Sequence, residues 1–255
     1  MLLRGVLVGI LLVSAVFGLW GCGPSGGGPG VSPSPSPGKT QAPQILSVTV
    51  GTRELTSGDA VQTGQNVVFS GQGPASVQIR VYLGGNLIGT TTTGVAGDFT
   101  FTWNSGTTEG TFTLEFRAKD PALPESDPVP FTLVVDGTGP SLASIVARAD
   151  APLGTPPQVV VTFSEPIVVS DMTLFTLPAG FWTVSVGGTS VFNPTNIQLG
   201  PDKKTVTITG NALSDQLVVG DLVTVIFAPA LPLTVTDAAG NPCVTPSMIT
   251  GTVSP

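Results

Sequence analysis

Histidine is absent from this 255-residue chain, and its absence excludes several kinds of chemistry. Ser-His-Asp and Cys-His catalysis, most zinc sites and the usual general base near neutral pH all require an imidazole. Charged residues are also scarce, at 10% of the chain, and the 9 Lys and Arg are outnumbered by 16 Asp and Glu. The net charge of −7, with no basic run, lacks the electrostatic footprint of a nucleic-acid binder. The sequence therefore predicts no nucleic-acid partner.

Catalysis would have to depend on carboxylates or on a Ser-Lys pair. The acidic residues fall mostly singly, in turns or on polar strand faces, as Asp98 and Glu115 do. Glycosidase chemistry needs two carboxylates that flank a cleft, which a compact sandwich of about 100 residues seldom provides. We therefore predict that the chain is not an enzyme and holds no catalytic cofactor.

Cysteine is limited to Cys22 and Cys243, which do not suggest a disulfide framework. A free cysteine most often behaves as a small buried apolar residue, so we expect Cys243 to be buried; pairing between chains is the alternative. Glycine (33), proline (24) and a hydrophobic content of 41% are plentiful instead. This composition is typical of an all-β protein rich in turns.

The first 21 residues have the pattern of an export signal. A basic residue, Arg4, precedes the apolar run VLVGILLVSAVFGLW, which extends from Val6 to Trp20. A transmembrane helix needs about 20 apolar residues, so this run is short for a permanent span. The ending LWGC, in which Gly21 precedes Cys22, resembles the lipobox of bacterial lipoproteins. The resemblance implies that Cys22 becomes the lipidated N-terminus; the alternative is an ordinary secretory signal, or a single weak span, whose cysteine is incidental.

Residues 22–43 are predicted to form a disordered tether after the lipid anchor. The segment GPSGGGPGVSPSPSPGKTQAP has almost no apolar side chain to bury and cannot offset the entropy of ordering. Its SPSPSP half favours polyproline II and is a stiffer spacer than its glycine-rich half. The residue after Cys22 is Gly23 and not an aspartate. In this the chain resembles the lipoproteins that two-membrane bacteria sort to the outer membrane. We therefore expect a lipid-anchored protein of the cell envelope, at the outer membrane or cell surface in such a host.

Short runs with period-two alternation fill the rest of the chain. SVQIRVYL, DFTFTW, TFTLEFRA and PFTLVVD alternate apolar and polar residues in the first half, and turn residues separate them. After DGTGP at 136–140 the pattern restarts in QVVVTFSEPI, KKTVTITG and DLVTVIFA. Short strands at such spacing are typical of a Greek-key sandwich. We predict two tandem immunoglobulin-like (Ig-like) β-sandwiches, at residues 44–138 and 139–255.

Two stretches resemble known Ig-like families. VYLGGNLIGTTTTGVAGDFTFTW, GTFTLEFRAKDP and FTLVVDGTGP are similar to the bacterial Ig-like domains that recur in tandem on surface proteins. VVVTFSEPI, LGPDKKTVTITG, LVVGDLVTVIFAPA and VTDAAGNP resemble the Ig-like repeats of S-layer and related secreted proteins. Together the two resemblances imply a bacterial surface lipoprotein with two tandem Ig-like domains. Such domains serve as spacers, adhesins and enzyme appendages, so the fold does not fix the function.

Two kinds of residue are candidates for binding. Calcium takes hard oxygen ligands, and some aspartates fall near predicted sandwich ends and the joint between the sandwiches. These weak calcium candidates are Asp120, Asp136, Asp150 and Asp237. Because aspartate in turns is expected simply for backbone hydrogen bonding, calcium is not the favoured interpretation. In AGFWTVSV, adjacent residues of a strand point to opposite faces, so Trp182 should lie inward with Val184, and Phe181 should lie outward or against the neighbouring domain as a candidate partner contact.

Two hypotheses for function follow from this organisation. In the first, the lipid anchor holds the chain on the membrane and the Ig-like domains act as a spacer or a binding and adhesion module for another envelope or extracellular protein. In the alternative, the chain is a carbohydrate-binding surface lipoprotein that holds a glycan on a row of exposed aromatic residues. Only three Trp and one Tyr are present, and Trp20 belongs to the export signal. That scarcity favours the first hypothesis.

Overall fold

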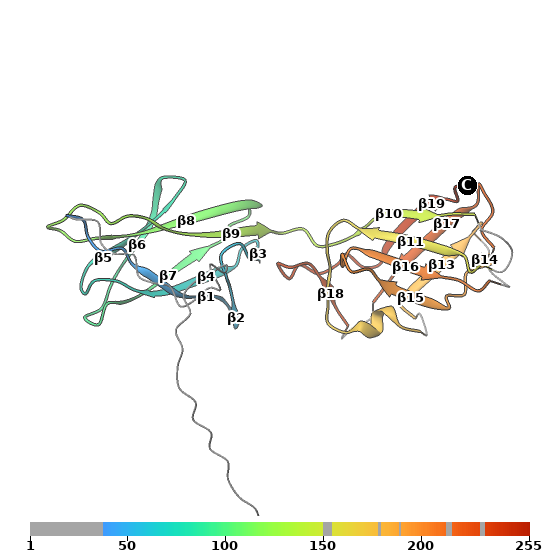
Figure 1. The fold of residues 1–255 in the computed structure, drawn as a ribbon, viewed down its shortest axis with the longest axis horizontal. Helices are drawn as coiled ribbons and strands as arrows, with labels where there is room; N and C mark the ends of the chain where they lie inside the picture. The colour runs from blue at the N-terminus through green and yellow to red at the C-terminus, as the bar shows by residue number, and fades with distance from the viewer. Residues whose placement is uncertain (1–37, 150–154, 178–179, 189, 213–215, 230–232) are drawn as a thin grey trace, which may run out of the picture. The chain divides into compact units, whose positions relative to one another are not determined.

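Two all-β sandwiches make up the folded part of the chain (Figure 1). The computed structural model describes residues 38–149, 155–177, 180–188, 190–212, 216–229 and 233–255. These residues fall within one compact unit, Ser32–Pro255. No helix in this described part is long and apolar enough to span a bilayer.

Sandwich 1 consists of two sheets. One has the order β2 (Arg53–Glu54), β1 (Gln44–Val50), β4 (Asn66–Gln72) and β7 (Asp98–Asn104). The other has the order β3 (Ala60–Gln62), β9 (Val129–Asp136), β8 (Gly110–Lys119), β5 (Gln78–Leu83) and β6 (Asn86–Thr92). Short strand β3 pairs in parallel with β9, whereas the other pairs are antiparallel. This division of the strands, with crossovers between the sheets, is that of an Ig-like sandwich.

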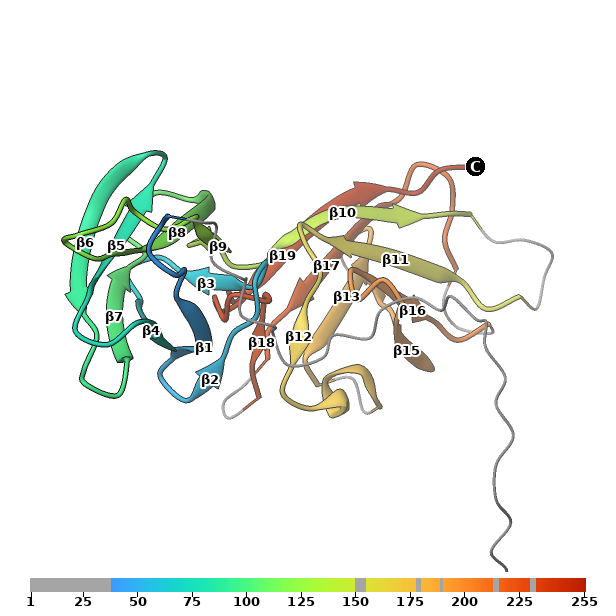
Figure 2. The same cartoon turned by 60° about the vertical axis from the view of Figure 1, so that its left-hand side comes forward.

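Sandwich 2 has the same kind of topology. Its first sheet has the order β10 (Leu142–Ala147), β11 (Gln158–Phe163), β16 (Thr205–Thr209) and β15 (Asn196–Leu199). Its second has the order β14 (Ser190–Val191), β13 (Trp182–Val186), β17 (Leu222–Phe227) and β19 (Ser247–Thr252). A small pair, β12 (Val168–Val169) with β18 (Val235–Thr236), and the 3-10 helix η1 (Met172–Phe175) complete it (Figure 2). The strand order matches a constant-type Ig sandwich with one added short edge strand, β14, so the predicted fold class is confirmed.

Each sandwich has its own core, and the side chains that fill it are those that the predicted alternation places inward. In β5, Ile79 and Val81 are fully buried, while Gln78 and Arg80 lie on the other face and are half-buried. The same alternation buries Val223, Val225 and Phe227 of β17, and the buried clusters of the two sandwiches share no residue. Burial of side chains at every second position is what fixes the strand register, because a one-residue slip would expose them all.

Sandwich 1 makes contacts with the last residues of the predicted tether. The Thr40 hydroxyl donates to the carbonyl of Pro124 at 2.8 Å and accepts from the amide of Asp120 at 3.1 Å. Thr40 is buried, and so is Ala42. The chain is therefore held by the loop after β8 a few residues before β1 begins.

Candidate functional site

The predicted site residues lie in different surroundings in the structure. Cys22 and Asp150 lie outside the described residues, so the lipidation of Cys22 stays a prediction. Trp182 points into the core of sandwich 2 as expected, with 3% of its surface exposed. Phe181 precedes β13 and is partly buried, because it packs against the core of its own sandwich instead of projecting freely outward. Its contact with a partner stays a prediction as well.

Two of the aspartate candidates come together with a residue that the sequence analysis missed. Carboxylate oxygens of Asp136, Glu165 and Asp237 all lie within 4.8 Å of one another. Asp120 is not in this cluster, and its Oδ1 accepts from the amide of Ala122 at 2.8 Å, as in an ordinary turn. Glu165 follows β11 in the motif SEP, and the sequence carries no signal that it meets two residues from other segments.

Asp237 is committed to the local backbone. Its Oδ1 accepts from the amides of Gly240 (2.6 Å) and Asn241 (2.8 Å), and its Oδ2 accepts from the Asn241 side-chain amide at 2.7 Å. The same Asn241 side chain donates to the carbonyl of Asp136 at 2.9 Å, where β9 ends. Asp237 therefore holds the loop that contacts the segment joining the sandwiches, which is the structural role that turns give to aspartate.

The pKa of Glu165 is raised, chiefly because burial disfavours its charge and then because Asp237 and Asp136 repel it. Glu109 adds to the repulsion, whereas Lys204 opposes it. The cluster offers three carboxylates that could hold a cation, but two of them already take part in hydrogen bonds to loop backbone. As it stands, the cluster is a local source of repulsion.

Replacing Glu165 with glutamine should raise the stability of the protein at pH 7 and leave it unchanged at acid pH. A carboxyl whose folded pKa is raised contributes its stability fully below the ordinary glutamate pKa of about 4.3, and loses it as pH rises through the folded value. The gain from Glu165→Gln should therefore appear only as pH rises, and urea unfolding at both pH values measures it. An equal difference at both would show that charge is not the cause.

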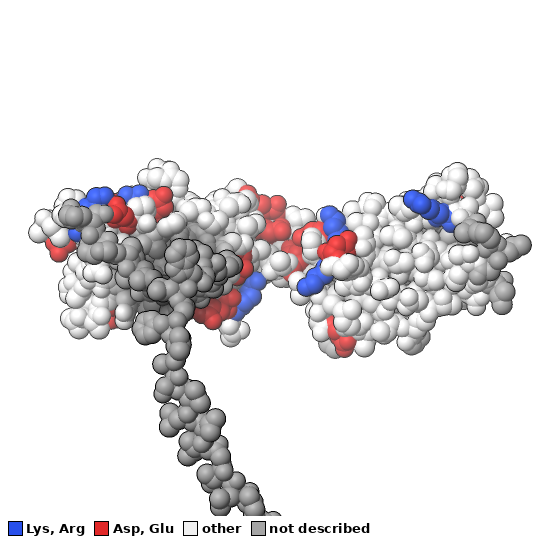
Figure 3. All heavy atoms as spheres, viewed as in Figure 1, with Lys and Arg blue, Asp and Glu red and all other residues white. Residues whose placement is uncertain are grey.

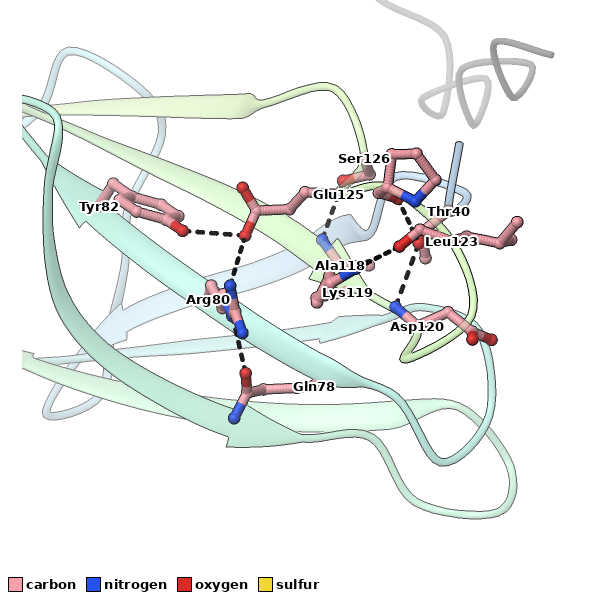
Figure 4. Close-up of polar contacts among 11 residues, drawn as sticks. Thr40, Gln78, Arg80, Tyr82, Ala118, Lys119, Asp120, Leu123, Glu125 and Ser126 are labelled. Atoms are coloured by element: carbon pink, nitrogen blue, oxygen red, sulfur yellow. Dashed lines mark hydrogen bonds and ion pairs between the residues drawn. The ribbon is translucent and has the colours of Figure 1, made fainter. Parts of the chain in front are cut away.

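The outer face of the β5–β8 pair carries a network of charged side chains (Figure 4). Arg80 donates from Nε to Gln78 at 2.7 Å and lies 3.5 Å from a Glu125 oxygen, which also accepts from the Tyr82 hydroxyl at 2.9 Å. In the next strand, Arg117 donates to Glu115 at 2.7 Å. Glu125 comes from the loop after β8. The same loop also contacts Thr40, through Asp120 and Pro124.

Two arginines face each other across this strand pair, since Arg80 is in register with Arg117. Like charges directly opposite each other destabilise a sheet, and here each is matched by a glutamate. The Arg117 guanidinium lies 5.5 Å from the centre of the Tyr82 ring, and its hydrogen bond to Glu115 raises its pKa. Tyrosine and arginine are enriched in protein interfaces, so this face is a candidate contact surface for a protein partner.

No aromatic side chain is exposed among the residues that the structure describes. Trp103 and Trp182 are buried, and Tyr82 is half-buried beneath Arg117. A sugar-binding platform needs exposed rings in a row, so this part of the chain offers none. Figure 3 shows that most of the visible surface is also uncharged.

A cavity of about 590 Å³ lies on the outer face of β10 and β11. Val146 and Val160, which are in register, line it together with Arg148 and Gln158. Among the described residues that line it there is no carboxylate, so the cavity has no acid pair of the glycosidase kind there.

Cys243 is buried in the core of sandwich 2, as predicted. Burial raises the pKa of its thiol to about 11. A thiol reacts through its thiolate, so Cys243 is poorly suited to pair with another chain.

Comparison with known proteins finds similarity only among solved structures. No protein-family model matches the chain, and no curated protein is similar to it. Among solved structures, it is similar to the fibronectin(III)-like modules of Clostridium thermocellum CbhA, at 16% identity and a TM-score of 0.30, over 81% of this chain and 94% of that one. For the BSP domain of a biofilm-associated protein, the identity is 19% and the TM-score is 0.25, over 78% of this chain and 29% of that one. For the tandem titin domains A164–A165, the identity is 13% and the TM-score is 0.26, over 76% of this chain and 93% of that one.

Proposed function

We propose that the chain is a lipid-anchored protein of the cell envelope in which two Ig-like sandwiches act as a spacer or a binding module for another protein. The observation that supports a spacer or protein-binding role is the character of the surface formed by the described residues. It has no exposed aromatic ring and no carboxylate among the described residues that line the cavity on β10 and β11, but it has a sheet face that carries arginine and tyrosine. Sheet faces and edges of this kind suit contacts with protein rather than with sugar.

The lipid anchor is proposed from the sequence alone. An apolar run ends at Cys22, and a segment that is rich in Gly, Pro and Ser follows it. Each buried methylene contributes about 0.8 kcal/mol, so more than one acyl chain is needed for a stable anchor. With such an anchor, the tether lifts the sandwiches off the membrane surface. In a host with two membranes, Gly23 favours the outer membrane.

Cys22→Ala should abolish labelling by an alkyne fatty acid in a bacterial host that processes lipoproteins, because the sulfur is the attachment point. Cys243→Ala is the matched control: it removes the other thiol, which is buried, and should keep full labelling. Labelling is read on a denaturing gel, so any loss of stability in the control does not affect it. Cys22→Ala chains labelled as strongly as the wild type would refute the anchor.

A further inference from the structure

Four arginines lie in the part of the chain that the structure describes, and three of them have partners. Arg53 donates to two backbone carbonyls, and Arg80 and Arg117 are each paired with a glutamate. Arg148 is exposed, and its guanidinium has no hydrogen bond or ion pair with another described residue. A planar guanidinium binds a carboxylate through two parallel hydrogen bonds, so Arg148 is free to bind an anion from outside the chain.

Arg148 stands at one end of a polar row that crosses three strands. The register of β10 with β11, continued one residue beyond its last pair, places Arg148 opposite Gln158. On its other side, Gln158 pairs with Thr209 of β16. The side chains of all three have no hydrogen bond to another described residue, and all three residues line the cavity of about 590 Å³. Three side chains with free donors therefore border one space.

An apolar shelf lies beside this polar row. Val146 and Val160 pair with each other on the same face, and both line the cavity, as do Pro156 and Pro157. Val146 is 45% exposed, so part of this shelf is uncovered. Two residues along a strand span about 7 Å, which puts the valine pair one side-chain length from the polar row. A mostly apolar lining with a few polar groups, in a space of this volume, is typical of a ligand site.

The lining determines the chemistry of the ligand. Its one charge among the described residues is positive and matches a single carboxylate, whereas a phosphate dianion would bring a second negative charge without a partner. Beyond the valine pair, the face continues with Ser144 and Thr162, which pair with each other. The shelf is therefore one residue pair deep. It can cover one apolar side chain, but a long acyl chain would have to continue over polar groups.

A C-terminal residue carries its carboxylate and its side chain on the same Cα, so both can reach one small site. In an extended internal segment, by contrast, an acidic residue and its apolar neighbour point to opposite sides. Charge and shape together therefore favour a chain terminus, and capture of a C-terminal carboxylate is one of the general modes of peptide recognition.

We propose that the cavity on β10 and β11 binds the C-terminus of another protein whose last residue is apolar. The terminal carboxylate accepts hydrogen bonds from Arg148 and Gln158, and the side chain packs on Val146 and Val160. The inference rests on the protein-binding part of the proposed function, for which it names the chemistry of a partner, and it does not depend on the lipid anchor.

Titration with a short peptide tests this site. The purified full chain, with isotope-labelled valine methyl groups, is titrated with acetyl-Gly-Ser-Leu as the free acid and followed by NMR. We expect saturable shifts of the methyl signals of Val146 and Val160. The same peptide with a C-terminal amide, and acetyl-Gly-Ser-Ser as the free acid, should each bind about tenfold more weakly. Each lacks one of the two contacts, and a charged hydrogen bond or a buried leucine contributes roughly that factor.

Arg148→Gln should weaken binding of the free acid about tenfold and leave binding of the amide unchanged. Arg80→Gln is the matched control: it makes the same substitution on sandwich 1 and should change neither. A second variant, Val146→Ser, should bind the peptides that end in leucine and in serine equally well. The proposal is overturned if no shift saturates, if the amide binds as tightly as the acid, if Arg148→Gln keeps the wild-type affinity, or if the shifted valines lie in sandwich 1.

Photo-crosslinking in intact cells separates this site from the proposed function. A benzophenone-bearing phenylalanine replaces Val146 in one full chain and Tyr82, on the candidate contact surface of sandwich 1, in another. Crosslinks from the Val146 position should map to the C-terminal peptide of the captured protein. If the Tyr82 position captures a protein and the Val146 position captures none, or an internal peptide, this site is wrong and protein binding remains. No capture from either position counts against both.

Discussion

Trp182→Ala should lower the free energy of unfolding of sandwich 2 by about 3 to 5 kcal/mol, the range for emptying a large core site. The indole is 3% exposed, its ring centre is 4.3 Å from that of Phe227, and its Nε1 donates to the carbonyl of Leu174 at 2.9 Å. Alanine would remove the ring contacts and leave a buried carbonyl without its donor, which adds to the cost. Urea unfolding followed by circular dichroism measures the change.

Phe181→Ala is the neighbouring control. Phe181 is only partly buried against the same core, so its loss should cost much less than that of Trp182. The two variants remove rings from adjacent positions that differ in depth of burial, and Phe181 has no counterpart of the indole hydrogen bond. If Phe181→Ala proved the more damaging change, the strand phase of β13 would be wrong.

The strand phases could be predicted because each depends on a few neighbouring residues. Alternation in DFTFTW and DLVTVIFA correctly places Phe99 and Val225 in the core, since period two is a property of any extended strand. Phe181 shows the limit of the rule. β13 begins at Trp182, so alternation does not extend back to residue 181, and packing of the preceding turn decides where that ring lies.

The candidate sites could not be predicted in the same way, because they join segments far apart in the sequence. Glu165 meets Asp237 through the folding of sandwich 2, and Glu125 reaches Arg80 from a loop 45 residues away. Sequence spacing gives no distance between such residues. Alternation along β5 does place Arg80 and Tyr82 on the same polar face, and these two residues are part of the network in Figure 4.

The second large effect is expected in sandwich 1. Phe116→Ala should lower its free energy of unfolding by about 3 to 5 kcal/mol, because Phe116 is fully buried in the core and packs within an aromatic cluster. Its ring centre lies 4.9 Å from that of Phe69 and 6.1 Å from that of Phe101. Phe112→Ala is the control: it lies on the same face of β8 but is only partly buried.

The same variant tests whether the sandwiches unfold separately. Their buried clusters share no residue, so the loss of Phe116 should leave the unfolding transition of sandwich 2 where it is. Trp103 and Trp182 lie one in each sandwich, and in the chain from Cys22 onward Trp103→Phe leaves the fluorescence of Trp182 as the reporter of sandwich 2. In that background Phe116→Ala should shift the circular-dichroism transition of sandwich 1 and not the fluorescence transition. A parallel shift of both would show that the hydrogen bond from Asn241 to Asp136 belongs to a joint strong enough to make the two sandwiches unfold as one.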